Sequence, residues 1–373
     1  MTQIHYLAIL LLFFLFNSCQ HQETQVLYLG ADLSYVNEME DCGGTYRLNG
    51  KVADPYWIFS QKGTNIVRLR LWHTPEWSGY SDLKDVTESI RRSKAAGMAV
   101  LLDFHYSDFW ADPQKQIIPK AWEPVVDDLE ALGDSMYNYT RDVLIALAEK
   151  SLAPEFVQVG NEINIEILQE KDSMLLDRIN WPRNVELLNH GIQAVRDVTM
   201  EKELDTQVML HIAQPEFAIP WLKDAARHNI QKYDWIGLSY YPKWSEYEMD
   251  EVGPTIDSVK TMFDTRVMLV ETAYPYTMLN VDSSGNILWK DSLAPGYPAT
   301  PEGQLNFMVD LTKAVISGGG EGVIYWEPGW ISTGCSTPWA TGSAWDNATF
   351  FDGSNQNEAL PVFNFLTYDY HAN

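Results

Sequence analysis

Residues 99–110 read AVLLDFHYSDFW, a short apolar run that ends in a cluster of polar and aromatic side chains. Similar apolar runs recur along the chain, at Val26–Ala31, Ile66–Leu71, Ala99–Phe104, Phe156–Val159, Gln207–Ile212, Trp235–Ser239, Val267–Val270 and Gly322–Tyr325. Runs that are apolar throughout, rather than alternating with polar residues, are typical of parallel strands buried on both faces. The sequence therefore predicts eight parallel strands.

Helical patterns separate these runs. The predicted helices include Asp82–Ala96, Leu129–Lys150, Arg183–Thr199, Pro215–Ala226, Thr255–Phe263 and Pro301–Ile316. Eight strands, each followed by a helix, predict a (β/α)8 TIM barrel of class α/β, in which function sits on the loops after the strands. A doubly wound sheet is the competing architecture, but no Gly-x-Gly-x-x-Gly turn follows any strand. We expect residues 26–373 to form one catalytic domain.

The composition restricts the kind of partner. The 373 residues include 51 Asp and Glu against 26 Lys and Arg, a formal net charge of −25. Such an acidic chain is a poor match for nucleic acid or another polyanion, because affinity for phosphates rests on Lys and Arg. With 14 Trp, 19 Tyr and 14 Phe, the composition favours a neutral partner with flat apolar faces, as sugars have.

The N-terminus resembles an export signal. Residues 7–16 read LAILLLFFLF and are followed by Asn-Ser-Cys19. Ten apolar residues are too few to span a bilayer but suit the apolar region of a signal peptide. The small residue before Cys19 resembles the bacterial lipoprotein signal, so we expect a signal peptide over 1–18, lipidation of Cys19 and a tether over 19–25. An ordinary signal peptide is the alternative. The lipoprotein interpretation predicts an exported protein on a bacterial membrane, the outer membrane at the cell surface, that contacts the membrane only through its lipid.

Two further cysteines follow the leader. Cys42 lies just after the first strand and Cys335 just after the last. Cysteines of an exported protein can pair, and these two lie near each other if the chain closes into a barrel. The alternatives are a Cys42–Cys335 disulfide and two buried free thiols.

Polar and aromatic side chains gather just past the strand ends. They are Asp32, Arg68, Arg70, Asp103, His105, Asp108, Trp110, Asn161, Glu162, His211, Tyr240, Tyr241, Trp244, Glu271, Trp326, Glu327 and Trp330. Glu162 and Glu271 each directly follow an apolar strand, the fourth and the seventh, which lie on opposite sides of an eight-stranded barrel. A retaining glycosidase needs two carboxyl groups about 5–5.5 Å apart. Either glutamate alone is explained by pairing with Arg68 or Arg70; both together favour catalysis.

Several motifs resemble one family. They are GADLS at 30–34, VRLRLW at 67–72, LLDFHYSDFWADP at 101–113, QVGNEI at 158–163, LSYYP at 238–242, VETAY at 270–274 and YWEPGWI at 325–331. Together they resemble glycoside hydrolase family 53 of clan A, the endo-β-1,4-galactanases. The resemblance implies Glu162 as acid/base and Glu271 as nucleophile of a retaining enzyme that acts on the β-1,4-galactan side chains of pectin, and it implies no organic cofactor.

The same resemblance suggests roles for the other rim residues. Asn161 would bind the sugar 2-hydroxyl, Tyr240 would hydrogen-bond the nucleophile, and Trp326 would floor the central subsite. The remaining substrate-binding candidates are Asp32, Arg68, Arg70, His105, Asp108, Trp110, Trp244 and Trp330. An arginine of the second strand is expected to lower the pKa of Glu271, and the charge of Glu271 to raise that of Glu162.

Two loops suggest a cation. Asp282-Ser-Ser-Gly-Asn286 follows the seventh strand and Ser343-Ala-Trp-Asp346 follows the eighth. Alone, the first is typical of an ordinary turn. The two loops resemble those of bacterial members of the family, which are joined through one Ca²⁺. The resemblance implies a structural ion here, with Asp282, Ser284, Asn286, Ser343 and Asp346 as its ligands.

Other functions remain open at this point. A clan A endo-glycanase on another neutral β-glycan, such as mannan or xylan, would share the barrel and the two glutamates. A glycan-binding surface lipoprotein without catalysis would need a catalytic carboxylate replaced, whereas both are present. A calcium-stabilised adhesion module gives no reason for a complete catalytic rim. We expect a monomer.

Overall fold

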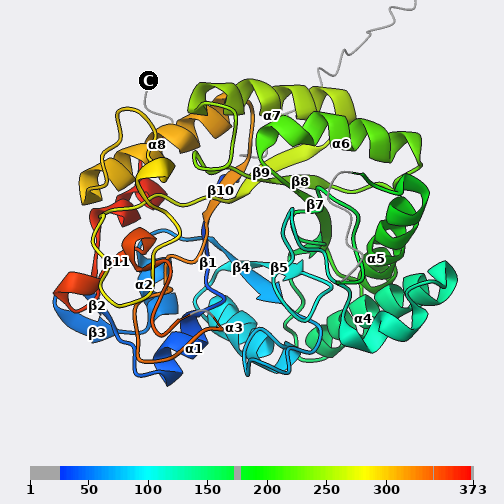
Figure 1. Ribbon diagram of the computed structural model, residues 1–373, viewed down its shortest axis with the longest axis horizontal. Coiled ribbons are helices and arrows are strands. Elements are labelled where there is room, and N and C mark those ends of the chain that lie inside the picture. The colour runs from blue at the N-terminus through cyan, green and yellow to red at the C-terminus, as the bar shows by residue number, and fades with distance from the viewer. Residues whose placement is uncertain (1–25, 172–177, 339, 371–373) are drawn as a thin grey trace, which may run out of the picture.

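A computed structural model describes residues 26–171, 178–338 and 340–370 (Figure 1). Its centre is a closed barrel of eight parallel strands, β1 (Tyr28–Asp32), β4 (Ile66–Leu71), β5 (Ala99–Phe104), β6 (Phe156–Val159), β7 (Gln207–Ala213), β8 (Trp235–Ser239), β9 (Arg266–Glu271) and β10 (Gly322–Tyr325). The strands neighbour one another in sequence order, and β10 pairs with β1 to close the ring. The predicted TIM barrel is confirmed, and each strand lies within two residues of its predicted bounds.

Helices form an outer ring around the barrel (Figure 1). They are α1 (Val36–Asp41), α2 (Pro55–Gln61), α3 (Leu83–Ala95), α4 (Leu129–Ala148), α5 (Trp181–Glu201), α6 (Pro215–Arg227), α7 (Met249–Phe263) and α8 (Pro301–Ser317). The side chains of Asp82, Asp128 and Thr300 cap the first turns of α3, α4 and α8.

Two helical predictions need correction. Helix α7 begins at Met249 rather than at Thr255, because Glu248 and Glu251 form a capping box and Pro254 still lies in the first turns. After β10 the described chain has no α-helix but three 3-10 helices, of which the longest and last is η5 (Pro361–Thr367). That segment is held instead by burial of its apolar side chains against the core.

A small second sheet was not predicted. It joins β2 (Tyr46–Leu48) and β3 (Lys51–Ala53) to β11 (Phe351–Asp352) and β12 (Glu358–Ala359), in the order β11-β12-β2-β3. Strands of two or three residues leave too short a pattern to detect in sequence. Nearby, Cys42 and Cys335 form a disulfide with a Cα–Cα distance of 5.8 Å. Sheet and disulfide both tie the loop after β1 to the segment after β10.

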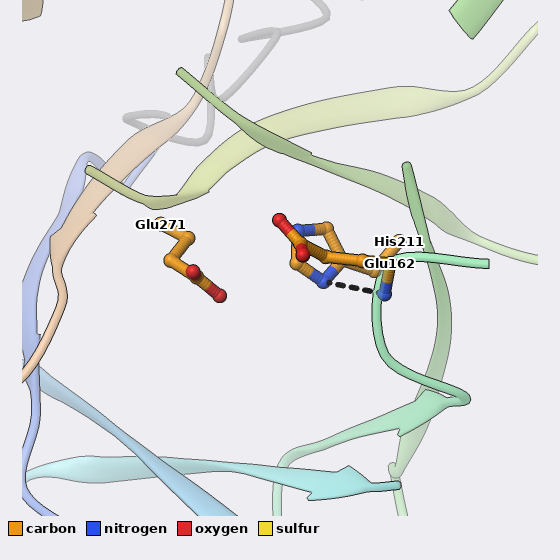
Figure 2. Close-up of side chains that lie close together, drawn as sticks. All are labelled: Glu162, His211 and Glu271. Atoms are coloured by element: carbon orange, nitrogen blue, oxygen red, sulfur yellow. Dashed lines mark hydrogen bonds between the residues drawn. The ribbon is translucent and has the colours of Figure 1, made fainter. Parts of the chain in front are cut away.

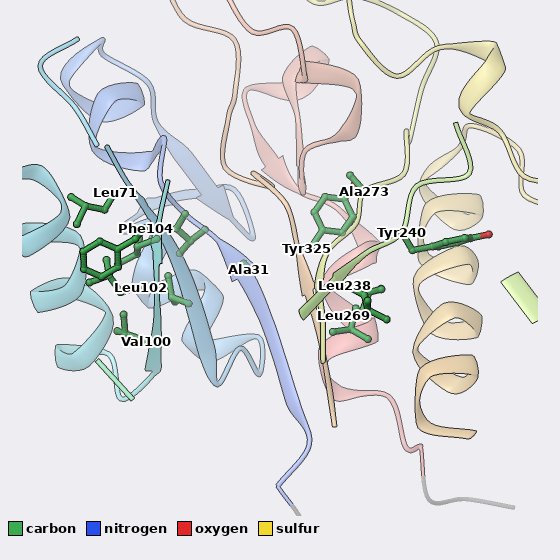
Figure 3. Packing of buried hydrophobic residues seen from close by; sticks show 14 of the residues in the cluster. Ala31, Leu71, Val100, Leu102, Phe104, Leu238, Tyr240, Leu269, Ala273 and Tyr325 are labelled. Atoms are coloured by element: carbon green, nitrogen blue, oxygen red, sulfur yellow. The ribbon is translucent and has the colours of Figure 1, made fainter. Parts of the chain in front are cut away.

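The barrel interior changes character along its axis. The alternation of side chains along β4 turns Ile66, Arg68 and Arg70 to one face. Ile66 belongs to an apolar cluster of buried residues with Leu101, Phe156, Met209, Trp235, Met268, Val270 and Ile324, and Tyr28 of β1 packs against it. Arg68 and Arg70, further along, join polar side chains at the carboxyl ends. A second, larger cluster fills the space between strands and helices (Figure 3). No helix within the described ranges has both the length and the apolar character needed to cross a bilayer.

Candidate active site

A cavity of about 800 Å³ opens at the carboxyl ends of the barrel strands. Most of the predicted rim residues line it: Asp32, Arg68, Arg70, His105, Trp110, Asn161, Glu162, Trp244, Glu271, Trp326 and Trp330. These residues are far apart in the sequence, and they meet because the eight carboxyl ends share one rim. Asp108 and Tyr240 do not line the cavity.

Glu162 and Glu271 face each other across this mouth (Figure 2). Glu271 is the last residue of β9, whereas Glu162 follows β6 after a turn in which Gly160 and Glu162 have φ of +86° and +45°. A non-glycine residue held at positive φ costs about 1–3 kcal/mol and is found mainly at functional sites. A carboxylate oxygen of each glutamate and a ring nitrogen of His211 lie within 4.8 Å of one another. This separation suits a retaining glycosidase.

Glu271 is held by two donors. Arg68 Nη1 donates to its Oε2 at 3.1 Å, and the Tyr241 hydroxyl donates to its Oε1 at 3.0 Å. Arg68 also pairs with Asp32 at 3.0 Å and Asp103 at 2.8 Å, so one guanidinium serves three buried carboxylates.

This sharing changes the expected titration of Glu271. Burial raises the pKa of Glu271 to about 7, although Arg68 and the Tyr241 hydrogen bond act in the opposite direction. The expected arginine is present and does lower the pKa of Glu271, but removing the carboxylate from water outweighs a cation that it shares, so the net shift is upward.

Tyr240 does not contact the nucleophile. Its hydroxyl donates to the Tyr247 carbonyl at 3.3 Å, and the neighbouring Tyr241 donates to Glu271 in its place. Side chains alternate along a strand, so the inward position of Ser239 predicts that Tyr241, not Tyr240, points into the barrel. That alternation was the signal that would have identified Tyr241.

Glu162 has a different environment. Its Oε1 lies 2.6 Å from the Ser239 hydroxyl. Burial, followed by the negative charge of Glu271, raises the pKa of Glu162 well above its ordinary value. A carboxyl group that keeps its proton near neutrality is what a general acid requires. Ser239 itself ends β8 as a small polar residue, and no sequence motif singled it out.

Asn161 and His105 hold the rim between β5 and β6. Asn161 accepts from Arg68 Nη2 at 2.6 Å and donates to the Ala111 carbonyl at 2.8 Å. His105 Nε2 lies 3.0 Å from an oxygen of Asp103, and its Nδ1 accepts from the backbone N–H of Ala111 at 3.0 Å. Since Nδ1 accepts, the proton of neutral His105 is on Nε2. Burial lowers the pKa of His105, which favours this neutral form.

Asp108 was expected to bind substrate, but the structure gives it another role. Its carboxylate accepts from the backbone N–H groups of Thr74 at 2.8 Å and Lys120 at 2.9 Å. It thereby joins the loops after β4 and β5 outside the cavity. A carboxylate occupied by two backbone donors is a structural cap of these loops.

Aromatic side chains surround Arg70 beside the cavity, and Trp110 and Trp330 among them line it. The Arg70 guanidinium lies 4.8 Å from the ring centre of Tyr35, 4.6 Å from Trp72 and 5.3 Å from Trp110. The Tyr35 ring stacks on Trp330 at 4.0 Å. Elsewhere on the cavity, Trp326 packs edge-to-face against Trp345 at 4.6 Å, and Trp244 is 46% exposed. Rings of this kind offer stacking faces to apolar sugar faces.

The five predicted calcium ligands lie close together in the loops after β9 and β10. Asp282 accepts from the backbone N–H groups of Ser284 and Ser343, both at 2.7 Å. Asp346 accepts from Asn286 Nδ2 at 2.7 Å, while Asn286 Oδ1 is buried with no hydrogen-bond partner among the described residues. An oxygen-only donor set with an unpaired buried oxygen fits a hard cation such as Ca²⁺.

Comparisons with known proteins agree with this geometry. The model of glycosyl hydrolase family 53 matches residues 28–366. The chain is 52% identical to an arabinogalactan endo-beta-1,4-galactanase of Cellvibrio japonicus, over 92% of each chain. It is 35% identical to an endo-beta-1,4-galactanase of Bacillus subtilis, over 90% of this chain and 82% of that one. A solved GH53 catalytic domain from Ignisphaera aggregans matches it with a TM-score of 0.82 at 32% identity, covering 92% of this chain and 95% of that one.

Proposed function

The chain belongs to glycosyl hydrolase family 53, and on this basis we propose that it is a retaining endo-β-1,4-galactanase. Its substrate is the β-1,4-galactan of pectin side chains. The observation that carries the proposal is the pair of buried carboxyl groups, Glu162 and Glu271, which face each other in a cavity with an aromatic wall. The similarity to two galactanases over most of the chain supports galactan as the sugar.

The reaction follows from the two environments. In the first step, the Glu271 carboxylate bonds to the anomeric carbon while the glycosidic C–O bond breaks, and Glu162 gives its proton to the leaving oxygen. In the second step, water attacks the anomeric carbon, its proton passes to Glu162, and the Glu271–sugar bond breaks. Arg68 and Tyr241 favour ionised Glu271, and the pKa of Glu162 favours its protonated form. Asn161, held by Arg68 and the Ala111 carbonyl, would bind the 2-hydroxyl.

Incubation of the protein with linear β-1,4-galactan, β-1,4-mannan and xylan tests the proposal. We expect reducing ends to be released from galactan alone, with the β-anomer as the first product seen by proton NMR. Glu271→Ala and Glu162→Ala should both abolish this activity, while Glu88→Ala, an exposed surface change, should leave it intact. Release of reducing ends from mannan or xylan instead would show that galactan is not the substrate. No release from any of the three glycans would support a glycan-binding protein without catalysis.

We also propose that one Ca²⁺ joins the loops after β9 and β10. Asp282, Ser284, Asn286, Ser343 and Asp346 would hold it, and the ion would supply structural cross-linking rather than chemistry. Chelation should lower the melting temperature of the wild type by several degrees and leave that of Asp282→Asn unchanged. Equal melting temperatures with and without chelator in the wild type would contradict the site.

Finally, we propose that the enzyme is a lipid-anchored monomer. Cys19 and the signal over 1–18 lie outside the described residues, so the proposal rests on the apolar run and the cysteine that follows it. One chain builds the whole cavity, which favours a monomer. Mass spectrometry of the protein from bacterial membranes should find a diacylglyceryl group on Cys19, and light scattering of the soluble domain should give one chain. A Cys19→Ser variant that stays in the membrane would contradict the anchor.

A further inference from the structure

A chain of three short hydrogen bonds runs from the acid/base carboxyl group into the barrel wall. Glu162 Oε1 lies 2.6 Å from Ser239 Oγ, which lies 2.9 Å from His211 Nε2. On the other side of the ring, His211 Nδ1 lies 2.9 Å from Asn161 Oδ1. All four residues are buried. Figure 2 shows the His211 ring and the Glu162 side chain overlapping in the view, with the hydrogen bond from the backbone N–H of Glu162 to the His211 ring as a dashed line.

The far end of this chain is fixed as an acceptor. Asn161 Oδ1 accepts from Arg68 Nη2 at 2.6 Å, and the amide nitrogen of Asn161 donates to the Ala111 carbonyl. The amide cannot be reversed without facing the guanidinium with its own N–H groups. His211 Nδ1 therefore donates to Asn161. The backbone N–H of Glu162 points to Nδ1 as a competing donor at 3.4 Å, and the Gln158 amide nitrogen lies 3.2 Å away. The contact with Asn161 Oδ1 is the shortest of the three at 2.9 Å and takes the Nδ1 proton, so in this tautomer Nδ1 no longer accepts from Glu162 or Gln158.

The three bonds require three protons. A neutral His211 supplies one proton, on Nδ1, and its bare Nε2 then accepts the single proton of the Ser239 hydroxyl. The third bond, between Ser239 Oγ and Glu162 Oε1, must be made with a proton on Glu162. The other arrangement that supplies three protons needs a cationic His211. Burial, and the positive charge of Arg68, lower the pKa of His211 well below its ordinary value, which disfavours the cation.

We propose that Ser239 is a positioning residue whose hydroxyl switches partners with the state of Glu162, and that His211, held as the Nδ1–H tautomer by Asn161, is the acceptor that receives the hydroxyl in the free enzyme. When a sugar oxygen takes the proton of Glu162, Ser239 turns and donates to Glu162 Oε1. One hydroxyl thus hydrogen-bonds the carboxyl group both when it is an acid and when it is a base. This proposal rests on the acid/base role proposed for Glu162.

The switch is expected to set the pH range over which Glu162 keeps its proton. Glu162 interacts with charged or titratable groups from several elements, namely Glu271 on β9, Arg68 on β4, Asp112 after β5, His211 on β7 and Tyr241 after β8. Among its neighbours, Ser239 is the one that hydrogen-bonds Oε1. The hydrogen bond that a hydroxyl donates to a charged carboxylate is stronger than the one that it accepts from a neutral carboxyl group. The Ser239 hydroxyl therefore stabilises ionised Glu162 more than protonated Glu162. Loss of the hydroxyl therefore favours the protonated form.

Ser239→Ala tests this effect, with Ser239→Thr as the matched variant that keeps a hydroxyl. On galactan, we expect Ser239→Ala to lower kcat/KM by about 10- to 100-fold and to move the alkaline limb of its pH profile up by about one unit. Ser239→Thr should restore the wild-type limb. A limb that stays in place in Ser239→Ala, with an unchanged melting temperature, would overturn the proposal, as would a Ser239→Thr limb that follows the alanine variant.

The tautomer of His211 gives a second test that needs neither activity nor a variant at Ser239. In ¹⁵N NMR of the histidine-labelled wild type, the His211 signals are assigned by their loss in His211→Asn. We expect a neutral ring at pH 7 with its proton on Nδ1. A proton on Nε2, or on both nitrogens, would contradict the proton count. If the protein instead cleaved no glycan while His211 showed the expected tautomer, the proposed function would fail and the hydrogen-bond assignment would stand.

Discussion

Arg68 and Arg70 stand two residues apart on β4, turn to the same face and are both almost fully buried, yet their surroundings differ. Arg68 pairs with three carboxylates, Asp32, Asp103 and Glu271. Arg70 pairs with one, Glu327, at 3.0 Å, and is otherwise surrounded by the rings of Tyr35, Trp72 and Trp110. The same side chain therefore meets charge at one position and aromatic faces at the next.

This difference separates two tasks of the site. Arg68 contacts the nucleophile directly, so its charge acts on the reacting atoms. Arg70 lines the same cavity but contacts neither Glu162 nor Glu271 among the described residues. Its partners are Glu327, Ser81 and the aromatic rings beside it, so its contribution to catalysis passes through the shape of the cavity wall. We expect changes at Arg68 to act on kcat and its pH dependence, and changes around Arg70 to act on KM.

The largest effect is expected from Arg68→Met, which keeps the length of the side chain and removes its charge. Three buried carboxylates then lose their cation, and breaking one buried pair already costs about 3–5 kcal/mol. We expect a comparable loss in the free energy of unfolding by urea titration, and a fall in kcat of about 10³-fold or more on galactan. Arg91→Met removes an exposed pair with Glu88 and serves as the control that changes neither quantity.

The pH profile sharpens this result. Glu271 must be ionised to attack, so kcat/KM should fall as the pH drops below about 7, the value to which burial raises its pKa. Arg68 lowers this pKa, and its removal should therefore shift the acid limb of any residual activity to higher pH. An acid limb shared by the wild type and Arg68→Met would contradict the role of Arg68 in holding Glu271 ionised.

A smaller effect on the same side of the comparison is expected from Tyr241→Phe. The variant loses the hydroxyl that donates to Glu271 at 3.0 Å. A hydrogen bond to a charged group contributes about 1.5–3 kcal/mol, so kcat should fall about 10- to 100-fold with little change in KM. Tyr240→Phe is the matched control, since its hydroxyl donates to the Tyr247 carbonyl and not to Glu271. Equal losses in both variants would show that the assignment of Tyr241 is wrong.

These two tyrosines also show how far the sequence leads. The eight apolar runs predict the barrel because parallel strands buried on both faces have few other arrangements, and the barrel then brings Glu162 and Glu271 to one rim. The orientation of Tyr240 and Tyr241 depends on where β8 ends and on the direction of each side chain past that end. Asp108 was misplaced for a related reason, because its partners, the backbone N–H groups of Thr74 and Lys120, have no sequence signature. The net charge state of Glu271 also required the structure, since burial outweighs the nearby arginine.

For the second arginine, Arg70→Met is expected to act on substrate binding, because it disturbs the aromatic side chains that shape the cavity beside it. Glu327 is left buried without its cation, while the rings lose a cation–π partner worth about 0.5–2 kcal/mol. We expect KM for galactan to rise and kcat/KM to fall about tenfold, with kcat and the acid limb close to the wild type. The double variant Arg70→Met/Glu327→Gln should recover part of the lost stability, because the neutral amide removes the unpaired charge. A shifted acid limb in Arg70→Met would remove the distinction between the two arginines.

The smallest effect on activity is expected from opening the disulfide. Cys42 directly follows α1, the helix that begins after Tyr35, and Cys335 follows Trp330 in the loop after β10. The disulfide therefore links the segment that carries Tyr35 to the segment that carries Trp330, and these two rings stack on the Arg70 side of the site. Cys42→Ser/Cys335→Ser should lower stability by about 2–4 kcal/mol and raise KM about two- to threefold, since a looser stack holds sugar less well.

Because neither cysteine of the disulfide contacts Arg68 or Glu271, the same double variant should keep the wild-type kcat and pH profile. Mild reduction of the wild type should lower the stability and raise KM in the same way. The Cys19→Ser variant, which keeps the disulfide, should have the stability and KM of the wild type. A change in kcat or in the acid limb on opening the disulfide would show that the stack of Tyr35 and Trp330 is coupled to the carboxylates around Arg68. The functional division between Arg68 and Arg70 would then not hold.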